Sequence, residues 1–459
     1  MTPEALDSLS RQELMALISG LVEQNRLLVE RNAGLDARIA ELEARLGVPP
    51  KTPDNSSLPP SRGEKANRPD QPPKPRPGRP GVARELCSDP DHVREVLAEA
   101  CAGCGHRLAA ADQIDVHAYD HIDLPPVKPV TTRVNLHRGA CPCCGARVVA
   151  PSPADMAPVS PFGPGIVALA VYLHTRHMVS FARLVELFHG LFGLRLSEGA
   201  IANMLARAAK PFAAEAVRIE AEVRAAPVIA CDETSARVEG VTCWQWVFAS
   251  ASAVCHRIAA SRGAAVATDF LNGVKPQVWI SDRLAAQSGH GRMHQVCLAH
   301  LWRDARYAID AGDKTFAPGF KFLLKRALAI GRRRDRLTDA TLVAYGRDLD
   351  GRLTRLLTVQ PDTPAGRKLR KGIAKCRDKL FVFITRRDVP PTNNVSERAL
   401  RPSVIFRKVT NGFRSAWGAA FDADVRSVIA TGALNGRTAL DAIRTCLDGR
   451  SVLASEPSG

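Results

Sequence analysis

Leucine recurs at every seventh position from residue 14 to residue 42, a spacing that fits an α-helix and no other regular structure. Because an α-helix turns once in about 3.6 residues, a seven-residue repeat forms a stripe that winds around a second helix. The sequence therefore predicts a leucine-zipper coiled coil over residues 10–48, ended by Pro49-Pro50, which cannot continue a helix. The repeated residues are Leu14, Leu21, Leu28, Leu35 and Leu42.

The residues between these leucines indicate how many helices pair. With leucine at d, the a positions are Ile18, Asn25, Asn32, Ile39 and Leu46. Isoleucine and asparagine at a favour a parallel two-stranded coil, in which buried asparagine fixes the register at a cost in stability. The alternative is one amphipathic helix packed on the body, which the polar a positions disfavour. We expect a homodimer, or a larger assembly, through this helix.

A proline-rich basic segment follows at residues 49–84. Seven prolines fall between Pro60 and Pro80, so this stretch cannot form a core and is expected to be an extended linker. Residues 76–81 (Arg-Pro-Gly-Arg-Pro-Gly) also resemble an arm that reads a DNA minor groove, although a plain tether is the favoured interpretation.

Two Cys-x-x-Cys-Gly turns, here called knuckles, lie within residues 85–150. One contains Cys101 and Cys104, and the other contains Cys141 and Cys144. Four thiolates suit tetrahedral Zn²⁺, and the glycine lets backbone amides turn toward the sulfur atoms. The pattern predicts a zinc-binding module with one structural Zn²⁺, and free structural cysteines are the alternative.

The stretch between the knuckles is expected to be a β-ribbon. It contains strand-like segments at residues 118–124 and 131–137. Cys143 is a spare thiol that could replace a neighbour in the ligand set.

Residues 158–226 are expected to be helical. Apolar periodicity covers residues 165–176 and 180–192, and Ser197 is a good cap for a further helix from Glu198 through Ala209. This spacing is typical of a helix-turn-helix that reads a DNA groove, and equally of a helical bundle joining two parts of the chain.

Residues 227–430 are predicted to form an α/β core with a mixed sheet, because three successive strands are followed by alternating helix and strand. An all-helical insertion is expected at about 308–390, and a C-terminal helix and tail at 431–459. The expected elements are strands 228–234, 243–250 and 254–261, helix 264–272, strand 277–282, and a strand and helix within 294–307.

Three carboxylates lie where metal chemistry would need them. Asp232 and Asp282 each end an apolar strand, and Glu397 lies in a short amphipathic helix. Such a trio suits two hard cations, Mg²⁺ or Mn²⁺, which can clamp the attacking and leaving oxygens of a phosphoryl displacement. Strand alternation sends Glu233 to the face opposite Asp232. Plainer explanations are aspartates that end strands at turns, and a surface ion pair between Glu397 and Arg401.

The charge distribution indicates a polyanionic partner. The formal net charge is +16, and residues 283–391 contain 24 Lys and Arg against 10 Asp and no Glu, a net of +14. Most of the excess thus lies between the second and third carboxylates, where it favours nucleic-acid binding over a mere solubility device. Clusters such as 332–336 and 367–371 support this interpretation.

Nothing in the sequence predicts a membrane span or a signal peptide. The protein is expected to be cytoplasmic and nucleoid-associated, with no membrane partner. Its 12 cysteines are then expected to stay free of disulfides.

The order of several motifs resembles the DDE transposases of the insertion sequence 66 family, from about residue 14 to the C-terminus. The segment Arg283-Leu284-Ala285 departs from the family pattern. The motifs are Asp232-Glu233-Thr234, Trp244-x-Trp246, Asp282, Cys297-x-x-His300, Asn393-Asn394-x-x-Glu397-Arg398-Ala399-Leu400-Arg401-Pro402 and Arg407-Lys408.

The resemblance implies a ribonuclease-H-like fold, with Asp232 on the first strand, Asp282 on the fourth and Glu397 on a late helix. It implies a transposase that binds terminal inverted repeats and catalyses Mg²⁺-dependent cleavage of DNA and strand transfer to target DNA, with accessory transposition proteins as further partners. The residues expected to contact DNA are His300, Arg303, Arg398, Arg401, Arg407 and Lys408.

Cys297 and His300 have two interpretations. A zinc site would need two more ligands, whereas related transposases use a similar Cys-x-x-His to organise the site near DNA, with a satisfied core histidine as a competitor. Two other functions remain open: a structure-selective DNA nuclease of the same fold, and a non-catalytic DNA-binding regulator built on the zinc module and the zipper.

Overall fold

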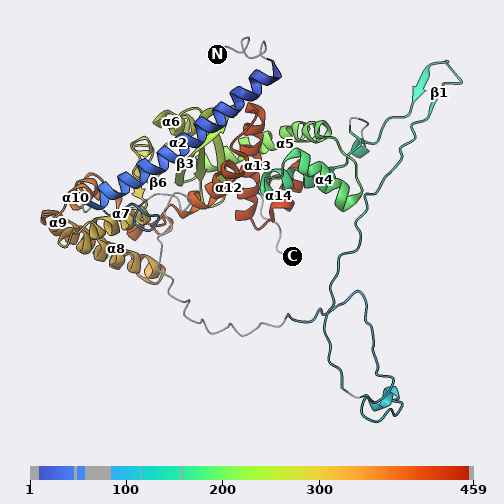
Figure 1. Cartoon of the computed structure of the whole chain (residues 1–459), viewed down its shortest axis with the longest axis horizontal. Coiled ribbons are helices and arrows are strands. Elements are labelled where there is room, and N and C mark those ends of the chain that lie inside the picture. Colours follow the sequence, from blue (N-terminus) through green and yellow to red (C-terminus); the bar gives the residue numbers. More distant parts are fainter. Residues whose placement is uncertain are drawn as a thin grey trace. The chain divides into compact units, whose positions relative to one another are not determined.

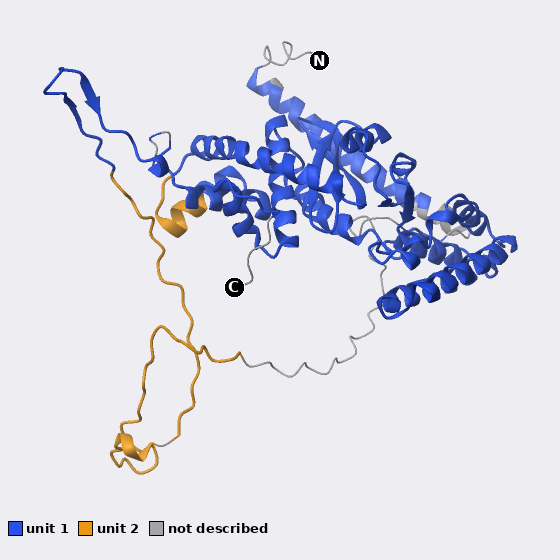
Figure 2. Cartoon of the chain, turned by 180° about the vertical axis from the view of Figure 1, so that it is seen from behind, with its two compact units in different colours: residues 1–64, 134–185, 196–459 blue, residues 65–133, 186–195 orange. Residues whose placement is uncertain are grey.

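The computed structural model describes residues 10–45, 49–56, 84–113, 115–156, 158 and 160–453. Figure 1 shows the whole chain, and Figure 2 shows its two compact units. One unit comprises residues 1–64, 134–185 and 196–459, and the other comprises residues 65–133 and 186–195. Most of the predicted linker, including residues 76–81, lies outside the described residues, as do Leu46 and the last six residues. No helix among the described residues is both long and apolar enough to cross a membrane.

The leucine repeat forms the helix predicted for it. Helix α2 runs Arg11–Arg45. Leu21, Leu28 and Leu35 remain more than half exposed in the single chain. Burial of such side chains is what stabilises most helices, so α2 retains an uncovered apolar stripe.

Residues 49–56, expected to begin the extended linker, pack against a helix of their own compact unit. Asn55 is buried and donates its side-chain N–H to Asp310 at 3.2 Å. The Lys51 ammonium lies 5.9 Å from the ring centroid of Tyr307. Both partners belong to α7 (Leu298–Asp310), so the described start of this segment is anchored to a helix.

The β-ribbon predicted between the knuckles is wrong. Residues 118–124 and 131–137 form no strand, and their apolar residues are exposed, with Leu124 almost fully so. Alternating apolar residues form a strand only when a core covers them, and none does here. Two short antiparallel strands instead flank the second knuckle, β1 (Arg138–Ala140) and β2 (Arg147–Val149).

The helical region forms as predicted, with one difference in length. Ser197 caps α5 by accepting the N–H of Ala200 at 3.1 Å. The helix continues through Pro211 because buried Phe212 and Ile219 extend its apolar stripe. It packs against α13, as in a helical bundle. The elements are α3 (Pro164–Val171), a π-helical turn (Tyr172–Arg176), α4 (Phe181–Phe192) and α5 (Glu198–Ala225).

A five-stranded mixed sheet forms the core, and the predicted α/β architecture is confirmed. The strand order is β5-β4-β3-β6-β7. The first three strands are antiparallel, whereas β6 and β7 run parallel to β3. The bounds are β3 (Val228–Val238), β4 (Val241–Ala249), β5 (Val254–Ala259), α6 (Ala264–Leu271), β6 (Val278–Ser281) and β7 (Met293–Val296).

The insertion is all-helical, as predicted, and shares one core with the sheet. Sheet residues such as Val247 and Ile280 belong to the same buried cluster as Phe320. A 3-10 turn at Arg377–Lys379 separates the last two helices of the insertion. The insertion helices are α8 (Phe316–Arg333), α9 (Asp339–Thr358), α10 (Pro364–Lys375) and α11 (Val382–Thr385).

Three further helices follow the insertion in the same compact unit: α12 (Asn394–Thr410), α13 (Ala416–Leu434) and α14 (Ala439–Leu447). The domain boundary expected at residue 430 therefore falls inside α13. Helix α12 contacts β3 and β4, whereas α13 contacts β5. One arginine of the basic cluster at 332–336 has a structural role: Arg334 donates to the carbonyls of Phe383 and Val389 at 2.7 and 2.6 Å, and holds the segment that leads to α12.

Candidate active site

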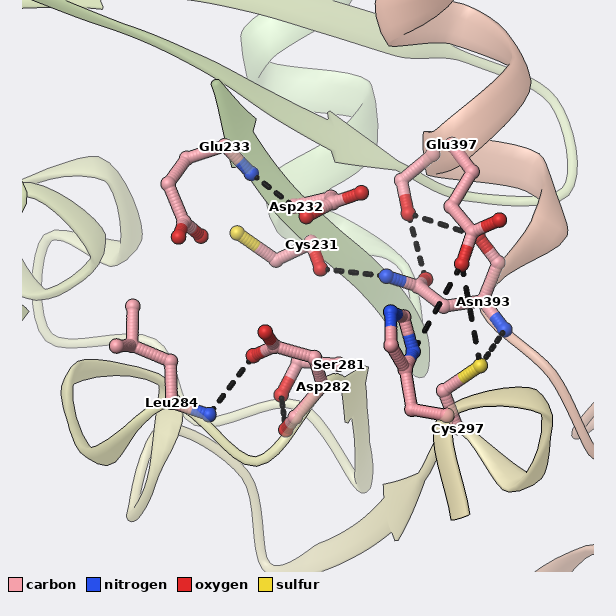
Figure 3. Close-up of polar contacts among 11 residues, drawn as sticks. Cys231, Asp232, Glu233, Ser281, Asp282, Leu284, Cys297, Asn393 and Glu397 are labelled. Carbon is pink, nitrogen blue, oxygen red and sulfur yellow. Dashed lines mark hydrogen bonds and ion pairs between the residues drawn. The ribbon is translucent and has the colours of Figure 1, made fainter. Parts of the chain in front are cut away.

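The register of the parallel strands β3 and β6 places two aspartates side by side. Ala230 pairs with Ile280, so two residues further along Asp232 lies beside Asp282. Ser281 pairs with Val296, which places Cys297 beside Asp282 in turn. Neighbouring strands lie about 4.8 Å apart. Contrary to the expectation from the sequence, Asp232 does not end its strand, because β3 continues to Val238. The edge formed by the C-terminal ends of β6 and β7, beside Asp232 within β3, therefore presents these side chains together (Figure 3).

Helix α12 brings Glu397 to the same edge, and a buried asparagine positions the helix. Asn393 donates its side-chain N–H to the carbonyl of Cys231 at 2.8 Å and its peptide N–H to Cys297 Sγ at 3.2 Å. Its side-chain oxygen accepts the Ser396 hydroxyl at 2.5 Å. The first turn of α12, with Glu397, is thus fastened to β3 and to the start of α7 (Figure 3).

Asn393 was missed as a functional residue from the sequence alone. The sequence shows Asn393 only as part of a motif. Its hydrogen-bond partners, Cys231 and Cys297, are 162 and 96 residues away in the chain, so the sequence does not reveal these contacts. The available signal was an asparagine at a helix start beside a candidate catalytic residue.

Asp282 has a turn role as well as its position at the edge. One of its oxygens accepts the N–H of Leu284 at 2.8 Å, and the Ser281 hydroxyl donates to its carbonyl at 2.9 Å. One carboxylate oxygen of Asp282 therefore closes a turn, as the plainer explanation of a strand-end aspartate predicts. That bond fixes the carboxylate in place at the end of β6.

Glu233 faces away from Asp232, as strand alternation predicts. Its carboxylate accepts hydrogen bonds from Arg262 at 2.9 Å and Gln287 at 2.7 Å. The Arg262 guanidinium also lies 4.7 Å from the ring centroid of Trp244. Glu233 is therefore a neutralised structural carboxylate. Arg262 and Gln287 were not anticipated from the sequence.

The electrostatics of Asp232 fit a cation site. Burial raises the pKa of Asp232 well above its usual value, and the carboxylates of Glu233, Asp282 and Glu397 raise it further. Only the N–H of Glu233, at 2.9 Å, acts in the opposite direction. A divalent cation would relieve this repulsion, and oxygen ligands are those that Mg²⁺ and Mn²⁺ prefer.

A second set of donors lies against Glu397. Glu397 Oε1 is 4.0 Å from Cys297 Sγ and 3.9 Å from His300 Nδ1. Among the described residues these three are the one set of three or more candidate ligands whose atoms all lie within 4.8 Å of one another. His300 Nδ1 is buried and has no hydrogen-bond partner within that part of the chain. The interpretation of His300 as a satisfied core histidine is therefore wrong.

The residues predicted to contact DNA differ in exposure and in their contacts. Arg398, Arg401 and Lys408 are exposed on α12, and Arg401 forms no ion pair with Glu397 in the described structure. Arg407 instead donates to the carbonyl of Ser235 at 2.6 Å and to its hydroxyl, which ties α12 to β3. His300 and Arg303 are partly exposed, one turn apart on α7.

The two knuckles have the same backbone turn. Gly105 and Gly145 adopt φ values of 73° and 72°, a left-handed conformation that glycine tolerates best. Each donates its N–H to the carbonyl of the first cysteine of its knuckle, at 2.9 and 2.8 Å. The glycine in Cys-x-x-Cys-Gly is therefore required by the turn.

The first thiol of each knuckle is surrounded by peptide N–H groups that favour its thiolate form. The peptide N–H of Gly103, and then that of Cys104, lowers the pKa of Cys101. The N–H of Cys144, followed by that of its neighbour, lowers the pKa of Cys141. A thiolate is the form that binds metal. The two knuckles fall in different compact units, so each is described by itself.

The described core is an α/β domain that collects carboxylates at one edge of a mixed sheet. A family model described as the transposase IS66 family matches residues 159–421, more than half of the chain. The chain therefore belongs to the IS66 transposase family. The matched range contains Asp232, Asp282 and Glu397, and it excludes α2 and both knuckles. A comparison with curated proteins gave no significant match.

Proposed function

We propose that the protein is a DDE transposase in which Asp232, Asp282 and Glu397 bind two Mg²⁺ or Mn²⁺ ions. The observation that carries this proposal is the register of β3 and β6, which sets the two aspartates side by side where α12 delivers Glu397. Membership of the transposase family supports the role, and the raised pKa of Asp232 supports a cation between the carboxylates.

The strand order supports a ribonuclease-H-like core. Three antiparallel strands followed by two parallel ones, with Asp232 on the first and Asp282 after the fourth, match the arrangement expected from the family resemblance. Glu397 on a helix that contacts β3 completes it.

The reaction would consist of two phosphoryl transfers on DNA. Water attacks a phosphodiester at the element end and releases a 3′-hydroxyl, and that hydroxyl then displaces the leaving oxygen of a target phosphodiester. The metal pair, when bound, would stabilise charge on the attacking and leaving oxygens. The three carboxylates would hold that pair, and Asn393 would keep Glu397 in place against β3.

Binding of terminal inverted repeats and target DNA would use the cations around the site. Arg398, Arg401 and Lys408 are exposed and would neutralise phosphates, with His300 and Arg303 nearby on α7. Phosphate contacts fix position rather than sequence, and they make affinity fall steeply with salt. Terminal-repeat recognition would then fall to the knuckles and the helical region. Such a protein would be nucleoid-associated in the cytoplasm and could work with accessory transposition proteins.

The knuckles are proposed to hold one structural zinc ion through Cys101, Cys104, Cys141 and Cys144, and this gives a testable prediction. Purified protein should contain about one zinc per chain. The Cys101→Ser variant should lose that zinc and become more sensitive to proteases over residues 85–150. Cys87→Ser, an exposed cysteine outside both knuckles, is the matched control and should keep its zinc. Elemental analysis that finds no zinc in protein purified without chelator would reject the site.

Pairing of α2 is proposed to join two chains, so that each acts on one element end. Deleting residues 1–48 should halve the mass measured by light scattering and depress products that join two ends, because the exposed leucine stripe is removed. The deletion stops before Pro49 so that the contact between Asn55 and α7 survives. Cleavage of a single end should persist. Unchanged mass and unchanged paired-end products would show that α2 does not pair.

A plasmid assay separates this function from its two alternatives. Supercoiled plasmid carrying the element ends is incubated with protein and Mg²⁺. Strand joining indicates a transposase, cleavage without joining indicates a structure-selective nuclease, and retardation without cleavage indicates a DNA-binding regulator. The clustered carboxylates favour the two enzymatic outcomes, and the family match favours the first.

A further inference from the structure

Three donors of different chemistry meet on one side of Glu397. Cys297 Sγ, His300 and the Glu397 carboxylate offer ligand atoms that all lie within 4.8 Å of one another. Cys297 Sγ makes a long contact of 4.0 Å with Glu397 Oε1, whereas 3.9 Å between His300 Nδ1 and Glu397 Oε1 is too long for a hydrogen bond. The cluster therefore has the composition of a metal site, and within the described residues its His300 Nδ1 has no hydrogen-bond partner.

Each donor is held by its local structure. Cys297 is the buried N-cap residue of α7, and its sulfur accepts the N–H of Asn393 at 3.2 Å. His300 lies one turn further on the same helix, so the two side chains share a face. Its Nδ1 is buried without a partner among the described residues. The Glu397 side chain is 30% exposed, which leaves an open approach from solvent.

The donor set selects against Mg²⁺. Magnesium prefers six oxygen ligands in an octahedron, whereas Zn²⁺ accepts sulfur, nitrogen and oxygen together in a tetrahedron. With zinc distances of about 2.0 Å to nitrogen and oxygen and about 2.3 Å to sulfur, neighbouring ligand atoms would lie roughly 3.3–3.5 Å apart. The observed 3.9 and 4.0 Å require a closure of about 0.5 Å, within reach of small side-chain rotations.

We propose that Cys297, His300 and Glu397 form a site for Zn²⁺ or another thiophilic divalent cation, distinct from the paired Mg²⁺ site that shares Glu397. Filling it would draw the Glu397 carboxylate toward α7 and withdraw it from Asp232. A thiophilic cation would therefore inhibit phosphoryl transfer. This inhibitory consequence rests on the proposed transposase function, whereas the binding itself does not.

Binding can be measured without any activity. The full chain is titrated with Co²⁺, and the thiolate-to-cobalt charge-transfer absorption is followed for the wild type, Cys297→Ser, His300→Ala and Cys376→Ser. Cys376 is a buried cysteine in the insertion and serves as the matched control. The knuckle cysteines are present in all four proteins, so their absorption cancels in the difference spectra.

The wild type and Cys376→Ser should show a component that Cys297→Ser lacks. His300→Ala, which changes a partly exposed side chain, should retain the component with affinity weakened at least about tenfold. Identical titrations of the wild type, Cys297→Ser and His300→Ala would overturn the site. His300→Ala also covers the case in which the cysteine variant fails to fold.

The inhibitory consequence has its own readout. Zn²⁺ added at fixed Mg²⁺ should suppress DNA cleavage by the wild type, and a chelator selective for Zn²⁺ should restore it. Cobalt binding at Cys297 without inhibition by Zn²⁺ would overturn the inhibitory role. Absence of Mg²⁺-dependent cleavage in the untreated wild type would count against the proposed function, while the cobalt titration would still decide the metal site.

Discussion

Replacing Glu397 with glutamine is expected to abolish DNA cleavage and strand joining, with rates lowered at least about 10³-fold, while binding to element ends changes only a few-fold. Glutamine keeps the shape of the side chain in the first turn of α12 but removes the charge that would neutralise a metal ion. Cleavage of labelled element ends, joining to a target and gel retardation with the same DNA would measure the three quantities separately.

The contrasting variant is Glu233→Gln. Glu233 neighbours Asp232 in the chain but is paired with Arg262 and Gln287 on the other face of the strand. Its glutamine variant should therefore retain metal-dependent cleavage. Full activity of Glu397→Gln would remove Glu397 from the metal site, and loss of DNA binding in that variant would assign it a structural role instead.

Asn393→Ala is expected to slow cleavage about 100-fold and to lower the free energy of unfolding by about 1–3 kcal/mol. The substitution leaves the Cys231 carbonyl without its donor in a buried site, and it releases the first turn of α12 from β3. A shift of Glu397 by a fraction of an ångström is enough to disturb a site that must orient two reacting oxygens.

The neighbouring asparagine provides the control for this prediction. Asn394 has the same chemistry and lies one residue further, but it is exposed. Asn394→Ala should therefore unfold at nearly the wild-type denaturant concentration. Urea unfolding and cleavage rates of both variants would test the idea, which fails if the two alanine variants are equally stable and equally active.

Elements with strong local signals could be predicted from the sequence. Strands β3 to β6 were anticipated within a few residues because each is an apolar run bounded by turns, and Ser197 was anticipated as a cap. The strand positions of Asp232 and Asp282 followed from the same runs. In these cases the residues that determine the structure are neighbours in the chain.

Features that depend on distant contacts could not be predicted. The approach of Cys297 and His300 to Glu397 requires the pairing of β6 with β7 and the hydrogen bond from the Asn393 N–H to Cys297 Sγ. That hydrogen bond joins residues 96 positions apart in the chain. The structural roles of Arg334 and Arg407 were hidden for the same reason, because their acceptors are remote carbonyls. The expected ribbon at 118–124 failed because alternation alone supplies no core.

The central claim is that Asp232, Asp282 and Glu397 bind the catalytic metal, and Asp282 has the strongest competing explanation because it also closes a turn. Strand cleavage by Asp282→Cys, measured in Mg²⁺ and in Mn²⁺, tests it most directly. Mg²⁺ demands oxygen ligands, whereas Mn²⁺ tolerates a thiolate more readily. We expect the variant to be inactive in Mg²⁺ and to recover part of its cleavage in Mn²⁺, with Glu233→Cys showing no such preference. Wild-type activity of Asp282→Cys in Mg²⁺, or the same loss in both metals, would contradict a role for Asp282 as a metal ligand.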